Sequence, residues 1–168
     1  MVNFSRWAKH LFMPPWAWRR AFPHATLDAI ETAIRQSETR HNGEIRFAIE
    51  THLAPARVWR GDSGRERAIE VFADLRVWDT EHNSGVLIYL LLADRDIEIV
   101  ADRGIAAQVE QSAWEAVAQA MEAAFRQGEF ERGALLGIEQ VSALLAAHVP
   151  PLGRNPDELA NRPVIVRS

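Results

Sequence analysis

Cysteine is absent from the 168-residue chain. This absence excludes disulfide bonds, thiolate metal sites and cysteine nucleophiles together, and it fits a cytoplasmic location. Long apolar runs are absent as well: no stretch reaches the roughly 18 residues of a membrane-spanning helix. The first residues also lack the apolar core and the small-residue cleavage site of a secretory signal. We therefore expect a cytoplasmic protein with one globular domain, a size at which a single core suffices.

Acidic residues are missing from the first 27 positions, which carry Arg6, Lys9, Arg19 and Arg20. The remainder holds the other 15 of the 19 basic residues against all 23 acids, a net charge of −8, although the whole chain carries −4. An acidic body argues against nucleic acid as a partner. The basic start of the chain therefore needs an explanation of its own.

The N-terminal segment, residues 1–23, is predicted to begin with an amphipathic helix at 3–12, which Pro14 and Pro15 end. Its apolar residues recur at helical spacing, and they are Phe4, Trp7, Ala8, Leu11 and Phe12. Three of the six tryptophans also fall within the first 18 residues. Three explanations stay open. The segment packs on its own domain, as aromatic helix faces usually do; it docks to a partner subunit; or residues 3–22 lie peripherally on the inner membrane, their bases on anionic lipid.

Hydrophobic periodicity predicts the rest of the secondary structure. A first helix is expected at 26–40, with Thr26 as its N-cap. A second helix is expected to begin at a capping box formed by Ser63 and Glu66. Two more are expected at 106–126 and 130–148. Strands are expected at 44–51, 85–92 and 97–101, and an edge strand at 164–166 within an extended C-terminal arm, 151–168. A loop containing Pro55 and Gly61 separates the first strand from the helix at Ser63.

The strand at 85–92 is apolar on both faces, which is typical of a central strand covered on both sides. A right-handed crossover makes the first two strands parallel. The turn at 94–96 makes the third strand antiparallel to the second. The predicted fold is α/β, a three-layer α/β/α sandwich with a small mixed sheet.

Four stretches, in this order, resemble the TPM domain family: 43–47, 76–88, 94–105 and 125–137. The resemblance extends from Leu27 to His148, marks 24–150 as a TPM-like domain, and suggests a short bacterial member of cytoplasmic type. It implies an α/β/α sandwich, divalent-cation binding in some members and an acid phosphatase activity attributed to others. Plant members are tied to photosystem repair. Because this sequence shows neither a signal peptide nor a membrane anchor, we expect no envelope role.

Three strand ends are predicted to meet at one edge of the sheet. The first two strands start there, and the antiparallel third strand ends there. Residues that can supply oxygen ligands lie beside these ends, and they are Glu44, Asp79, Glu81, Asn83 and Asp102. His82, Arg46 and Arg103 lie close by. Oxygen ligands suit a hard cation, Ca²⁺ or Mg²⁺. The alternative is that these residues are helix caps, turn residues and surface ion pairs.

No catalytic residue can be named, because the sequence has no Gly-x-Ser-x-Gly, His-Glu-x-x-His or glycine-rich phosphate loop. Arg46, Arg76 and Arg103 are candidates for gathering a phosphate. The Asp94-Arg95-Asp96 pair at the other edge lies in a hairpin turn. We therefore expect an accessory or binding protein that holds Ca²⁺ or Mg²⁺ at the acidic sheet edge and has an unidentified protein partner. A metal-dependent acid phosphatase is the alternative, and the sequence indicates no oligomeric state.

Overall fold

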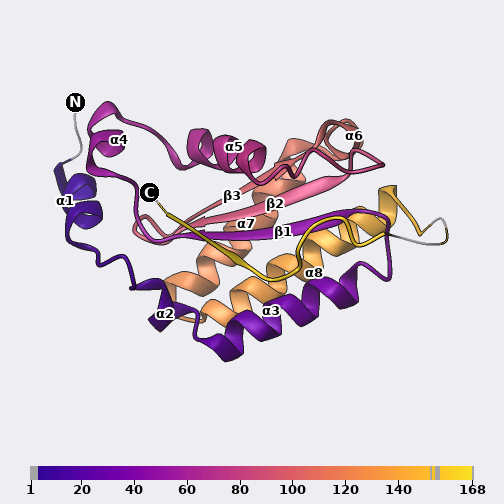
Figure 1. The fold of residues 1–168 in the computed structure, drawn as a ribbon, viewed down its shortest axis with the longest axis horizontal. Helices are drawn as coiled ribbons and strands as arrows, with labels where there is room; N and C mark the ends of the chain where they lie inside the picture. Colours follow the sequence, from indigo (N-terminus) through magenta and orange to yellow (C-terminus); the bar gives the residue numbers. More distant parts are fainter. Residues whose placement is uncertain (1–3, 152, 154–155, 168) are drawn as a thin grey trace.

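The computed structural model describes residues 4–151, 153 and 156–167. Within them, four strands form one sheet in the order β3-β2-β1-β4 (Figure 1). The strands are β1 (Glu44–Glu50), β2 (Gly85–Leu91), β3 (Asp96–Ala101) and β4 (Val164–Val166). β1 is parallel to both β2 and β4, and β2 is antiparallel to β3. The predicted mixed sheet and the short edge strand are confirmed.

Helices cover both faces of the sheet, which confirms the three-layer α/β/α sandwich (Figure 1). One layer contains α3 (His24–Ser37), α7 (Gln111–Arg126) and α8 (Phe130–His148), and the other contains α4 (Pro55–Arg60) and α5 (Gly64–Asp74). Alternate strand residues serve the two layers, because successive side chains of a strand point to opposite faces. Ile45, Phe47 and Ile49 belong to the core under the first layer. Leu87, Tyr89 and Leu91 belong to the core under the second.

Three local predictions are wrong in detail. The expected loop at Pro55 is α4, because proline fits the first turn of a helix and Gly61 closes it at φ 88°. α3 begins at His24, and the Thr26 hydroxyl does not cap it but donates to Glu131 at 2.6 Å. The helix expected from residue 106 is two helices, α6 (Arg103–Ala106) and α7. The capping box of Ser63 and Glu66 is confirmed at the start of α5.

The N-terminal segment forms α1 (Phe4–Phe12) and α2 (Trp18–Ala21). α1 lies beside α4 at one end of the molecule, and α6 lies at the other end (Figure 1). Phe22, just after α2, is fully buried in the core with Phe47 and Phe125. Across the described residues, no helix has the length and apolarity needed to cross a bilayer.

β2 is the centre of the fold, since all seven of its residues are buried. A charge at Leu90, which is fully buried, could be neither hydrated nor paired there. We predict that Leu90→Asp lowers the free energy of unfolding by several kcal/mol, roughly 3–5, measured by urea denaturation. Ile69→Asp on the exposed side of α5 is the control and should change it little. A Leu90→Asp variant as stable as the control would show that the core lies elsewhere.

Candidate cation site at the start of β1

The strand ends converge at one edge of the sheet as predicted. Glu44 is paired with Gly85 in the parallel register of β1 and β2. The Asp102 backbone N–H donates to the Gly85 carbonyl at 2.8 Å. A Cβ added to Gly104 would lie 2.5 Å from the Asn83 carbonyl oxygen, so the loop before β2 also packs against α6. The start of β1, the loop at 79–84 and the start of α6 therefore share this edge.

The five predicted ligands have different surroundings at this edge. Asp79, Glu81 and Asn83 are exposed. Asp102 is buried and caps α6, its Oδ1 accepting from the Arg103 N–H at 2.7 Å, while its Oδ2 has no hydrogen-bond partner within the described chain. Glu44 is buried, with 1% of its surface exposed. A joint role of these five residues as cation ligands remains a prediction.

A second set of carboxylates gathers around Glu44. Ligand oxygens of Glu38, Glu44 and Asp157 lie within 4.8 Å of one another. Of the histidine, aspartate and glutamate side chains described, no other group of three or more is as close. Glu38 follows the end of α3, Glu44 opens β1 and Asp157 comes from the C-terminal arm. Three separate segments thus bring one carboxylate each to the same point.

Asn161 lies beside this group. Its side chain, 7% exposed, lines a hollow of about 290 Å³ together with Glu38 and Asp157. Its Nδ2 donates to Asp157 at 3.3 Å, and its buried Oδ1 has no hydrogen-bond partner in the described part of the chain. Oε1 of Glu44 is likewise buried without a partner there. Buried polar atoms are nearly always hydrogen-bonded, so these two oxygens are available to a water molecule or a cation.

The C-terminal arm is fixed over this group by side chains of the domain. The Leu159 N–H donates to Oε2 of Glu44 at 3.2 Å. The Arg46 guanidinium donates to the carbonyls of Ala160 and Arg162. Arg162 in turn pairs with Asp28 and Glu31 of α3, both at 2.9 Å. The arm then enters the sheet as β4, so Asp157 and Asn161 are held at the edge where β1 starts.

The buried carboxyls of this group hold protons more tightly than usual. Burial, then the charge of Glu44, raises the pKa of Glu38 to about 8 from an ordinary 4.5. Burial raises the pKa of Glu44 to about 7, against the opposing effect of the Leu159 hydrogen bond. A bound cation would favour the ionised forms in place of the protons. The group therefore has two ways to relieve its repulsion, protonation or a cation.

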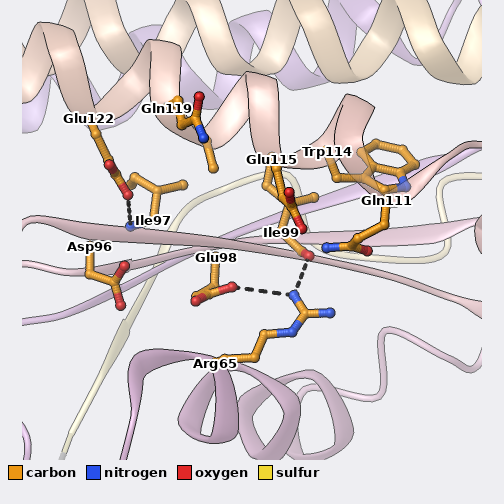
Figure 2. Close-up of a pocket in the computed structure, with 11 residues that line it drawn as sticks. Arg65, Asp96, Ile97, Glu98, Ile99, Gln111, Trp114, Glu115, Gln119 and Glu122 are labelled. Atoms are coloured by element: carbon orange, nitrogen blue, oxygen red, sulfur yellow. Dashed lines mark hydrogen bonds and ion pairs between the residues drawn. The ribbon is translucent and has the colours of Figure 1, made fainter.

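Figure 2 shows a second hollow, of about 430 Å³, along the outer edge of β3. Arg65 donates to the Ile99 carbonyl at 2.6 Å and Glu122 accepts from the Ile97 N–H at 3.4 Å. These side chains occupy hydrogen-bonding positions that a further strand would use, which protects the edge from pairing with another chain. The hollow is explained by edge protection, and we do not assign it a ligand.

The raised pKa values predict how the cation-free protein responds to pH. Between the unfolded value of 4.5 and the folded values near 7 and 8, the folded protein binds more protons than the unfolded chain. The contribution of these two carboxyls to stability therefore falls as pH rises from about 4.5 to about 8, by about 1.4 kcal/mol for each unit by which a pKa is raised. Glu38→Gln and Glu44→Gln should each flatten this dependence, measured by urea denaturation in chelator. A flat profile for the unsubstituted protein would contradict the assignment.

Comparison with known proteins gives the same fold. The family model for the TPM domain matches residues 20–144. The solution structure of the BA42 protein from the psychrophilic bacterium Bizionia argentinensis is 32% identical, with a TM-score of 0.74, and the match covers 84% of this chain and 93% of that one. An N-terminal domain from P. gingivalis is 17% identical with a TM-score of 0.57, covers 82% and 90%, and supports the fold alone. No curated protein matches the sequence. On the family match and the BA42 likeness, this chain belongs to the TPM domain family.

Proposed function

We propose that this TPM domain is a binding module that holds a divalent cation, Ca²⁺ or Mg²⁺, between Glu38, Glu44, Asp157 and the amide oxygen of Asn161. The observation that carries the proposal is the group of three carboxylates, whose ligand oxygens lie within 4.8 Å of one another and in which Oε1 of Glu44 is buried with no hydrogen bond of good geometry from the described residues. The sequence-predicted ligands Asp79, Glu81, Asn83 and Asp102 form the competing set at the same edge.

The donor set suits a hard cation. Carboxylate and amide oxygens are the preferred ligands of Ca²⁺ and Mg²⁺, and both ions complete their coordination with water. Asp157 is exposed while Glu38 and Glu44 are buried, so the group has one open side through which water and the ion can enter. A divalent charge would also oppose the repulsion between the carboxylates, whereas an uncompensated buried charge is costly.

The cation would join three segments of the chain. Bound between the end of α3, the start of β1 and the C-terminal arm, it would fasten the arm to the domain. This supports an accessory role in which the fixed arm and sheet edge face a protein partner. We place the protein in the cytoplasm on the absence of cysteine.

The phosphatase alternative finds no support at this edge. Arg46, a candidate for gathering a phosphate, is occupied by the carbonyls of Ala160 and Arg162. Thr39 lines the hollow beside the group, and its hydroxyl donates to the Gln36 carbonyl at 2.7 Å. We therefore do not extend the proposal to catalysis.

Thermal unfolding tests the cation site. A ligand that binds only the folded state stabilises it by RT ln(1 + [L]/Kd), about 2.7 kcal/mol at one hundred times Kd. We expect the Tm of the chelated protein to rise on addition of millimolar Ca²⁺ or Mg²⁺ and not on addition of NaCl at equal ionic strength. Asp157→Asn should remove the rise without affecting folding, because Asp157 is exposed.

Asp79→Asn is the matched control, since it removes one exposed carboxylate from the same edge outside the group. It should leave the rise in Tm intact. Loss of the rise in Asp79→Asn, with retention in Asp157→Asn, would move the site to the residues predicted from sequence. A Tm that no divalent ion changes would refute cation binding at either set.

A further inference from the structure

Helix α1 packs on the domain by its polar side. His10 is almost fully buried, its Nδ1 accepting from the Leu53 N–H at 2.9 Å and its Nε2 lying 3.1 Å from Asp94. Arg6 also contacts Asp94, at 2.9 Å, and donates to the Asp62 carbonyl. The attachment of α1 is therefore largely polar, with Trp7 partly buried beside it.

The apolar side of α1 consequently faces away from the domain. Phe4 is 72% exposed and Phe12 80% exposed, and Leu11 is exposed between them. An amphipathic helix on a globular domain normally buries its apolar stripe and exposes its charges. Here the order is largely reversed: of the stripe predicted from sequence, Trp7 packs on the domain, whereas Phe4, Leu11 and Phe12 are exposed.

Neighbouring elements carry further exposed aromatic side chains. Trp59 on α4, the helix that α1 contacts, and Trp16 in the turn after α1 are both 62% exposed. We call the set of Phe4, Leu11, Phe12, Trp16 and Trp59 the α1 surface. It contains five of the eight large hydrophobic side chains that are exposed in the described structure. Concentrated exposure of this kind marks an interaction site, whereas scattered single residues do not.

Among the described residues, the exposed charged side chains near the α1 surface that have no acidic partner are basic. Lys9 on α1 and Arg19 and Arg20 on α2 are exposed, and the first 27 residues contain no acid. The nearby acids are engaged: Asp94 by Arg6 and His10, and Asp62 by Arg57 and Arg60. Aromatic side chains beside exposed bases match the boundary between acyl chains and anionic headgroups.

We propose that the α1 surface inserts into the interface of an anionic lipid membrane, with Lys9, Arg19 and Arg20 against the headgroups. α1 has nine residues, which is far too short to span a bilayer, so it lies in the plane of the interface. The polar attachment through Asp94 keeps the helix folded on the domain while its apolar side enters the lipid.

Vesicle flotation of the full-length protein tests this proposal. We expect binding to vesicles of phosphatidylcholine with phosphatidylglycerol at low salt, and weak binding to phosphatidylcholine alone or at high salt, because the bases contribute by charge. Phe4→Ser/Phe12→Ser should reduce the partition coefficient about tenfold or more, since two phenylalanines leave the lipid. Both side chains are largely exposed, so the Tm should not fall.

Ile69→Ser/Trp78→Ser is the matched control, because it removes two exposed apolar side chains from α5 and the loop that follows it. It should bind vesicles like the unsubstituted protein. Failure of the intact protein to float with anionic vesicles at low salt would overturn the proposal, and so would equal loss of binding in both variants. A dimer in light scattering that Phe4→Ser/Phe12→Ser dissociates, without vesicle binding, would identify a second copy as the occupant instead.

Discussion

β1 is buried at every position but Arg46 and carries a buried glutamate at each end, and this constraint organises much of the molecule. A carboxylate between two layers of helices needs a hydrogen-bonded partner, or it must take up a proton. At the end of the strand, Glu50 has partners: the Tyr89 hydroxyl donates to it at 2.7 Å and Arg67 of α5 at 2.9 Å. Removing Arg67 would leave a buried charge alone, a costly change in proteins generally.

At the start of the strand the same problem has a different solution. Oε2 of Glu44 accepts from the Leu159 N–H of the C-terminal arm, and Oε1 is buried without a hydrogen-bond partner of good geometry in the described structure. No arginine or lysine described there forms an ion pair with it; Arg46, two residues away, donates to backbone carbonyls. At one end of β1 the charge of Glu50 is thus compensated by Arg67. At the other end, the carboxylates around Glu44 are suited to a metal cation that binds reversibly.

The central features of the fold could be predicted from sequence because their signals are local. The unbroken apolar run at 86–92 identified β2, and the short turn after it fixed an antiparallel β3. The path of the arm could not be predicted, because 151–163 has no periodicity and its position depends on Arg46 and Arg162 contacting distant segments. Glu44 was therefore found, but Glu38 and Asp157 were not. Asp157 and Asn161 were visible as oxygen ligands, yet nothing in the sequence placed them beside β1.

The amphipathic helix shows a different limit of sequence patterns. Its spacing correctly located the apolar side of α1, but spacing does not say which side meets the domain. That depends on Asp94, an acid more than 80 residues away that holds Arg6 and His10. A buried polar contact of this kind fixes orientation as well as position, because turning the helix would leave Asp94 and His10 without each other. The pattern predicts amphipathicity, and the polar anchor decides which side is left for a partner.

The two proposed surfaces lie at opposite ends of β1. The strand starts at the cation cluster and runs toward α1 and α4, where Thr51 donates to the Pro15 carbonyl and Leu53 donates to His10 (Figure 1). A domain that rests on a membrane through α1 would therefore hold Glu44 and the C-terminal arm away from the lipid. β1, buried at every position but Arg46, connects the two sites. On the two proposals, one end of the fold would serve for attachment, and the other, with the cation cluster and the arm, would face a partner in solution.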